Sequence, residues 1–196
     1  MLIPMFVSLF FIASVAKSQT YKSYTNGFFR VEAASDNDSY YLNEVFRILE
    51  AAKMDLERDW GFELNDSILL RVHPNLASYI RDTEMPWYVA AVANTKEDRI
   101  DTQRLRVLIE RNSLTKTLRH ELFHLAQPKD WPRWRAEGSA MLFAHETPKT
   151  YAILEITEDE LNALLENPHT HEELSRASAT ALSWVIAQRG SRGASK

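Results

Sequence analysis

The chain has 196 residues, of which 45% are hydrophobic and 26% charged, values that are ordinary for a globular protein with a core. A formal net charge of −4 and the lack of a basic patch argue against nucleic acid as a partner. The sequence contains no cysteine, which excludes disulfides and thiolate nucleophiles. Any zinc site must therefore use nitrogen and oxygen ligands.

The N-terminal segment is typical of a secretory signal. Its first 16 residues are almost wholly apolar, which is shorter than the ~20 residues that a membrane-spanning helix needs. Small residues of the kind found at signal cleavage sites end it: Ala13, Ser14, Ala16 and Ser18. No Lys or Arg precedes the apolar stretch, so an uncleaved anchor and a buried first helix stay open as alternatives. We predict a secretory signal over 1–18 and a single domain over 19–196. The mature protein is predicted to be secreted or periplasmic, without stable membrane insertion after signal cleavage.

Strands are expected mainly in the first half of the chain. The expected strands are residues 28–33 after an Asn26-Gly27 turn, 67–73, 87–93 and 99–103. Helices are expected at 41–60, closed by Gly61, and at 76–81. Residues 105–110 fit a strand or a helix equally.

Helices are expected in the second half. The expected helices are 114–126 with Ser113 as N-cap, 134–143 after a proline-rich turn, 159–166 after a Thr157/Glu160 capping box, and 172–189. Strands first and helices later predict an α+β fold. We expect a small mixed or antiparallel N-terminal sheet, followed by the helix of the candidate active site and by C-terminal helices.

The helix over 114–126 contains His120-Glu121-Leu122-Phe123-His124, an H-E-x-x-H motif. Residues four apart on a helix lie on one face, so both imidazoles can reach one zinc ion at about 2.0–2.1 Å. Glu121 lies one step round the helix, where it can act as a general base on water at the metal. The motif also occurs by chance, so a third ligand is needed to support a metal site.

Glu137 is the candidate third ligand. In the helix over 134–143 it falls on the same face as Trp134, Ala140 and Met141. A buried carboxylate needs a partner, and a zinc ion is such a partner, although a satisfied core carboxylate is the alternative. Gly138 costs about 1 kcal/mol of helix propensity relative to alanine, which predicts close approach of another backbone there.

The two segments together resemble the gluzincin zinc metallopeptidases. H-E-L-F-H is followed by P-R-W-R-A-E-G-S-A, similar to small bacterial peptidase domains whose second helix reads W-x-x-E-G-x-A. The resemblance extends upstream to residues 85–92 and to Arg99-Ile100, and it covers about 27–190. It implies a zincin-like fold, with zinc held by His120, His124 and Glu137 and with Glu121 as base.

Two positions depart from the family pattern. Many gluzincins have an aspartate four residues after the glutamate ligand, where this chain has Met141. Some relatives have a tyrosine near the last helices that stabilises the oxyanion, whereas residues 175–181 contain none. The candidate substitutes for this tyrosine are Tyr88, Arg119, His145 and Tyr151.

The sequence thus favours an exported zinc-dependent metallopeptidase that acts on a peptide or protein substrate. The alternative is a catalytically inactive zinc-binding or substrate-recognition module derived from such a peptidase. A third hypothesis is an exported binding protein in which the histidines merely pack. If the strand over 99–103 is an edge strand, an extended substrate can pair with it. His73, His169 and His171 are expected to lie outside the metal site.

Overall fold

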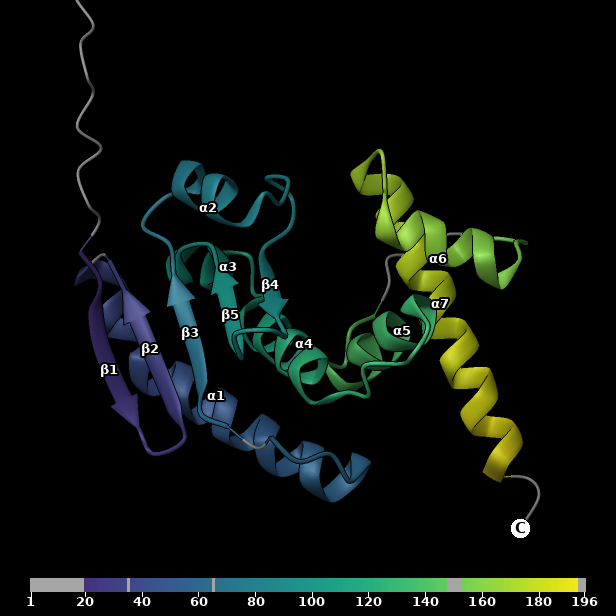
Figure 1. Cartoon of the computed structure of the whole chain (residues 1–196), viewed down its shortest axis with the longest axis horizontal. Coiled ribbons are helices and arrows are strands. Elements are labelled where there is room, and N and C mark those ends of the chain that lie inside the picture. Colours follow the sequence, from purple (N-terminus) through teal and green to yellow (C-terminus); the bar gives the residue numbers. More distant parts are fainter. Residues whose placement is uncertain (1–19, 35, 65, 148–152, 194–196) are drawn as a thin grey trace, which may run out of the picture.

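The computed structural model describes residues 20–34, 36–64, 66–147 and 153–193, with side chains as far as residue 190. The predicted signal over 1–18 and the candidate Tyr151 lie outside these ranges. The fold is α+β, as predicted: a mixed sheet with its covering helices stands beside a group of C-terminal helices (Figure 1). Within the described ranges, none of the helices combines the length and hydropathy needed to cross a bilayer.

The sheet has five strands in the order β1-β2-β3-β5-β4. Its strands are β1 (Lys22–Asn26), β2 (Phe29–Ala33), β3 (Ile68–Val72), β4 (Ala91–Asn94) and β5 (Arg99–Thr102). The pairs β1/β2 and β4/β5 are antiparallel, while β2/β3 and β3/β5 are parallel. The sheet is therefore mixed, with β1 and β4 as its two edges.

The sheet differs from the sequence prediction at three places. Strand β1 is not predicted, because its residues are polar and mostly exposed and therefore show no buried alternation. The strand predicted over 87–93 begins only at Ala91 and ends at Asn94, since the Gln103 side chain binds the carbonyl oxygens of Trp87 and Val89.

The strand predicted over 99–103 is β5, which lies between β3 and β4. The condition for substrate pairing with that strand, an edge position, is therefore not met. The edge strand on this side of the sheet is β4.

One layer of helices packs against the sheet. The chain passes from the 3-10 helix η1 (Asp36–Tyr41) into α1 (Leu42–Asp55) and the π-helix η2 (Leu56–Trp60). Gly61, as predicted, ends this run in a left-handed conformation with φ of 66°. The larger core forms where α1 and the later helix α4 (Leu114–Ala126) cover the sheet. Among its helical members are Val45, Leu49, Leu118 and Leu122. Two short helices, α2 (Leu76–Thr83) and α3 (Leu105–Glu110), complete this part.

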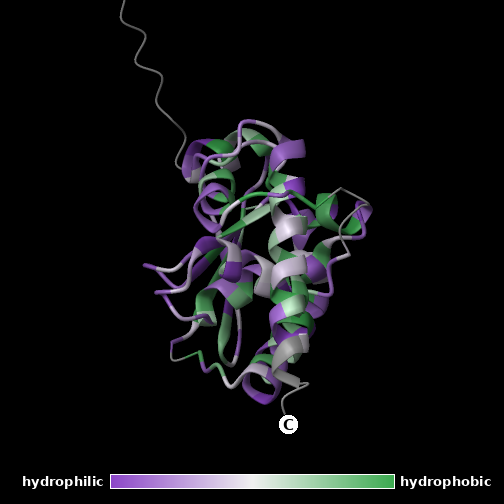
Figure 2. Cartoon of the chain, turned by 90° about the vertical axis from the view of Figure 1, so that its right-hand side faces the viewer, coloured by the Kyte–Doolittle hydropathy of each residue, from purple (hydrophilic) through white to green (hydrophobic). Residues whose placement is uncertain are grey.

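The remaining helices are α4 (Leu114–Ala126), α5 (Arg133–Phe143), α6 (Glu158–Glu166) and α7 (His171–Gly193). A second hydrophobic cluster joins α5, α6 and α7 through Trp134, Leu161, Ala177 and Ala181. Figure 2 views the molecule from this side, with α7 running down its length. Helix α7 continues through Gly190, whereas the sequence pattern predicts that the helix ends before this residue.

Of the two helix caps predicted at Ser113 and Thr157, only the cap at Thr157 forms its side-chain hydrogen bonds. The Thr157/Glu160 capping box at the start of α6 is confirmed, with both reciprocal hydrogen bonds present. Ser113 occupies the N-cap position of α4, but its side chain makes no cap hydrogen bond. Its hydroxyl instead donates to the carbonyl oxygen of Leu108 at 3.2 Å, because the tight α3–α4 turn brings that acceptor close.

The predicted close approach at Gly138 is confirmed. A Cβ atom built at Gly138 would lie 2.4 Å from the carbonyl oxygen of Ala181 in α7. Helices α5 and α7 therefore touch backbone to backbone directly beside Glu137. This contact sets the distance between α5 and α7.

Candidate metal centre

Helix α4 presents the H-E-x-x-H motif on the side facing α5 and β4. Its opposite face is anchored in the larger core through Leu118 and Leu122, which are fully buried. Residues three and four positions apart share a face of the helix, so this anchoring leaves His120 and His124 directed toward α5. Only about a tenth of each imidazole side chain is exposed.

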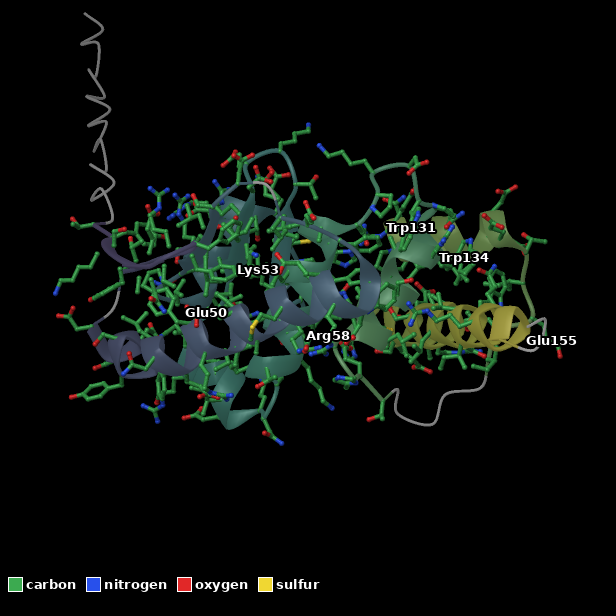
Figure 3. All side chains as sticks on the ribbon, turned by 90° about the horizontal axis from the view of Figure 1, so that it is seen from below. Glu50, Lys53, Arg58, Trp131, Trp134 and Glu155 are labelled. Atoms are coloured by element: carbon green, nitrogen blue, oxygen red, sulfur yellow. The ribbon has the colours of Figure 1, made fainter. Side chains whose placement is uncertain are left out.

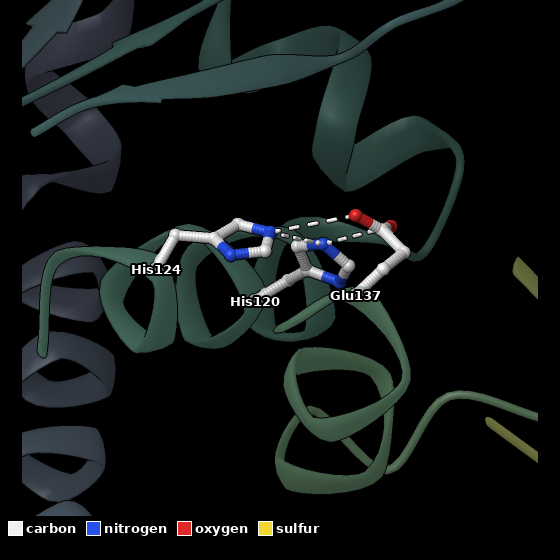
Figure 4. Close-up of side chains that lie close together, drawn as sticks. All are labelled: His120, His124 and Glu137. Carbon is white, nitrogen blue, oxygen red and sulfur yellow. Dashed lines mark hydrogen bonds and ion pairs between the residues drawn. The ribbon is translucent and has the colours of Figure 1, made fainter. Parts of the chain in front are cut away.

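The two histidines and Glu137 converge on one point (Figure 4). His120 Nε2 lies 3.0 Å from His124 Nε2 and 3.3 Å from Glu137 Oε1. His124 Nε2 lies 3.7 Å from Glu137 Oε2. Ligand atoms of the three residues lie within 4.8 Å of one another, a spacing that one metal ion can bridge. The structure thus brings together the three residues that the sequence singled out.

Each imidazole is oriented by a hydrogen bond from its Nδ1 atom to a carboxylate or an amide oxygen. His120 Nδ1 donates to Glu146 Oε1 at 2.8 Å, and His124 Nδ1 donates to the Gln127 side-chain oxygen at 3.2 Å. In the neutral form of each ring, a proton on Nδ1 leaves the Nε2 lone pair for a metal ion. Neither Glu146 nor Gln127 lies at a motif position, so the sequence gives no signal for these two residues.

The carboxylate that contacts His120 comes from Glu146 and not from position 141. Met141 is buried and has no carboxylate to offer. The chain turns back after α5 through His145, whose φ of 53° is left-handed, and the Glu146 N–H donates to the Met141 carbonyl oxygen. This reversal brings the Glu146 carboxylate to His120 from outside the helix.

The electrostatics of the group favour a cation at its centre. Burial and the neighbouring His120 lower the pKa of His124 to about 3, so this imidazole is neutral. Burial raises the pKa of Glu137, but the two histidines outweigh it and hold the pKa well below its ordinary value. Burial lowers the pKa of His120, yet Glu137 and Glu146 hold it well above 6.5. The surroundings thus stabilise positive charge where a divalent ion would lie.

Glu121 lines the same cleft as this group and lies near the backbone of Ala93 in β4. Burial raises its pKa to about 7, while His120 acts in the opposite direction and Ala93 of β4 supplies a backbone hydrogen bond that also lowers it. The residue is 9% exposed. A carboxyl group with a pKa near neutrality can both accept and release a proton at physiological pH.

A cleft of about 600 Å³ contains the whole group. It runs between β4 with the preceding loop, on one side, and α5 with residues 165–174, on the other. His120, Glu121, His124 and Glu137 all line it. Tyr88 also lines it, which keeps this residue as a candidate oxyanion donor.

Two other candidate donors are wrong. The Arg119 guanidinium points away from the cleft, binds the carbonyl oxygen of Phe143 and pairs with Asp55 at 2.7 Å. His145 follows the last turn of α5 and borders a separate surface hollow with Arg119. Arg119 could not be placed from the sequence, because its partner Asp55 is 64 positions away.

The other histidines stay outside the site, as expected. His73 is fully buried and pairs through Nε2 with Asp101 at 3.0 Å. The His171 ring packs edge-on against Tyr88, with 5.4 Å between ring centroids. Among the residues that the structure describes, His120, His124 and Glu137 form the only group of three or more such side chains placed to hold one ion.

Comparisons with known proteins leave the site to be interpreted from its own geometry. No protein-family model matches the chain. No curated protein and no solved structure matches it significantly.

Proposed function

We propose that this protein is an exported zinc-dependent metallopeptidase that hydrolyses peptide bonds in a peptide or protein substrate. The observation that carries the proposal is the convergence of two imidazoles and a carboxylate in a cleft that also contains Glu121. Three protein ligands with an open position are typical of catalytic zinc sites, whereas structural sites are closed by four.

The donor set suits zinc. Two imidazole nitrogens and one carboxylate oxygen form the His₂Glu combination found in catalytic zinc sites. His124 is neutral and Glu137 ionised, which are the protonation states that ligands require. The two carboxylates keep a proton on His120 in the absence of a metal ion, and this proton must be released when a metal binds. His120, His124 and Glu137 would hold the ion. When bound, Zn²⁺ supplies Lewis acidity and lowers the pKa of water toward neutrality.

Glu121 is the proposed general base. It takes a proton from the attacking water and returns it to the amine that leaves. Its pKa of about 7 suits both transfers, because the group is neither a strong acid nor permanently protonated at neutral pH. The same carboxyl group lines the cleft beside β4, where a substrate carbonyl would lie.

Strand β4 is the proposed platform for the substrate backbone. One side of it pairs with β5, and the other side borders the cleft that contains Glu121. An extended peptide can add to such an edge through backbone hydrogen bonds, which fixes its carbonyl groups relative to the catalytic residues. We assign this role to β4 and not to the strand over 99–103, because that strand lies inside the sheet.

The test compares wild-type protein with Glu121→Gln and Glu110→Gln. Glu110 is an exposed helical glutamate paired with Arg106, so its substitution controls for the loss of one charge. We expect zinc at one equivalent in all three proteins by elemental analysis. Cleavage of a peptide library should fall about 10²–10⁴-fold in Glu121→Gln alone, and a chelator should abolish it in wild type.

The outcomes separate the alternatives. Full activity in Glu121→Gln would show that the proposed base is wrong. Stoichiometric zinc without cleavage in the wild type would favour a non-catalytic zinc-binding module. Absence of zinc, with His124→Ala and Glu137→Ala indistinguishable from wild type, would reject the metal site itself.

A further inference from the structure

A second cavity lies on the far side of α5 from the metal centre. It has a volume of about 220 Å³ and forms where η2, the α4–α5 connection, α5 and α7 meet. Trp60, Phe62 and Trp131 give it aromatic walls, and Arg135, Ser139 and Arg189 supply polar groups. Figure 3 labels Trp131 in that connection. Arg135 and Ser139 are each two positions from Glu137, about 200° round the helix, so they face away from the metal ligands.

Both arginines are stacked on tryptophans. The Arg135 guanidinium carbon lies 4.2 Å from the Trp131 ring centroid, and that of Arg189 lies 3.8 Å from the Trp60 centroid. Stacking uses the flat face of a guanidinium and leaves its five N–H donors free in the plane. Each arginine is thus held in position while its hydrogen-bonding edge stays available.

Neither guanidinium has an acceptor among the side chains and backbone that the structure describes. Arg119 is the contrasting case: it also stacks on an aromatic ring, Phe143, but binds a carbonyl oxygen and Asp55. Within the described part of the chain, the side-chain contacts of Arg135 and Arg189 are these stacking contacts, and no ion pair or hydrogen bond engages either guanidinium. Burial lowers the pKa of Arg189, and no carboxylate offsets this.

Ser139 and Gln188 complete the polar lining of the cavity. Ser139 is 2% exposed and places its hydroxyl on the α5 side. Gln188 has a partner of its own. The two arginines are therefore the groups whose donors are offered to a ligand in this cavity.

We propose that this cavity binds a small organic carboxylate with a short apolar body. Planar guanidinium groups match carboxylate oxygens in a bidentate manner, and the aromatic walls suit an apolar group attached to that carboxylate. The cavity is smaller than the ~300–1,000 Å³ of sites for drug-sized ligands, which limits the body to one ring or one branched chain. This site is separate from the metal centre and does not depend on peptidase activity.

The test measures binding of 3-phenylpropionate by calorimetry and by the fluorescence of Trp60 and Trp131. Its neutral amide controls for the carboxylate, and acetate and inorganic phosphate control for the apolar body. Arg135→Gln and Arg189→Gln remove one donor each, while Arg111→Gln removes an exposed arginine outside the cavity. We expect the dissociation constant to rise about tenfold or more in each cavity variant, because each substitution removes one charge-assisted pair with the ligand. The dissociation constant should stay unchanged in Arg111→Gln.

A His124→Ala variant distinguishes this cavity from the metal centre, since a carboxylate can also bind zinc. Unchanged affinity in His124→Ala supports the proposal. Loss of binding there, with Arg135→Gln and Arg189→Gln unaffected, would overturn it and assign the ligand to the metal. Equal affinity for the amide would also overturn it, as would equal affinity for acetate or phosphate.

Discussion

Substitution of Gly138 by alanine should destabilise the protein through a clash between two backbones. The added Cβ would lie 2.4 Å from the Ala181 carbonyl oxygen and 2.9 Å from the Leu182 nitrogen. Ordinary contacts begin near 3.4 Å, so α5 and α7 must separate by about 1 Å. Such overpacking costs about 1–3 kcal/mol, while the better helix propensity of alanine returns about 1 kcal/mol. Because backbone yields less than a side chain, we expect a net loss of about 2 kcal/mol.

Gly190→Ala is the matched control. Gly190 also lies in a helix, α7, but nothing lies within 4 Å of a Cβ added there. The effect of the extra methyl group on the unfolded chain is similar at both positions, so the difference between the variants isolates the clash. We expect Gly190→Ala to gain up to about 1 kcal/mol.

The assay is thermal and urea unfolding followed by circular dichroism. For a chain of this length, 1 kcal/mol corresponds to about 2–4 °C in Tm. We therefore expect Gly138→Ala to melt about 4–8 °C below wild type and Gly190→Ala to melt at or above it. If Gly138→Ala were as stable as wild type, the proposed contact between α5 and α7 would be wrong.

Three further predictions concern other contacts. Glu146→Ala removes the acceptor of His120 and should weaken zinc binding about 10–100-fold in a chelator competition, whereas Glu110→Ala should not. Burial raises the pKa of Asp101, but His73 and Arg99 outweigh it and hold the pKa below 3.8. The ionised Asp101 therefore stabilises the folded protein fully at pH values above 3.8, the pKa of this group in the unfolded chain. This stabilisation is lost as the pH falls through the lower pKa that Asp101 has in the folded protein. The dependence of the urea midpoint on pH in this acidic range should therefore shrink in Asp101→Asn but not in Asp130→Asn, an exposed control. Thr157→Ala removes the capping box of α6 and should cost about 1 kcal/mol, seen as a Tm lower by 2–4 °C, while the exposed Thr115→Ala should not.

Local patterns explain what could be predicted from the sequence. The leucine spacing of α4 orients its buried face, and the i, i+4 spacing then places His120 and His124 on the other side. The Thr157 cap and the Gly61 helix end are equally local, since each depends on residues within one turn. The α+β class follows from the order of such elements along the chain.

Interactions between distant segments explain what was missed. Strand β1 is polar and exists because β2 offers it a free edge, which no property of residues 22–26 reveals. The position of β4 at the sheet edge depends on β3 pairing with β5 across a long connection. Glu146 reaches His120 only because the chain reverses at His145, a non-glycine residue in a left-handed conformation.

The metal centre depends on a packing contact outside it. Helix α5 belongs to the larger core through Ala140 and Phe143 and to the second cluster through Trp134, so it joins the two parts of the molecule. Glu137 is the neighbour of Gly138, where the distance between α5 and α7 is set. A shift of about 1 Å there exceeds the ~0.2 Å tolerance of metal–ligand distances. Gly138→Ala should therefore weaken zinc binding as well as stability, although Gly138 offers no ligand atom. Gly190→Ala should leave zinc binding unchanged, and equal zinc affinity in the two variants would show that the metal site tolerates this movement of α5.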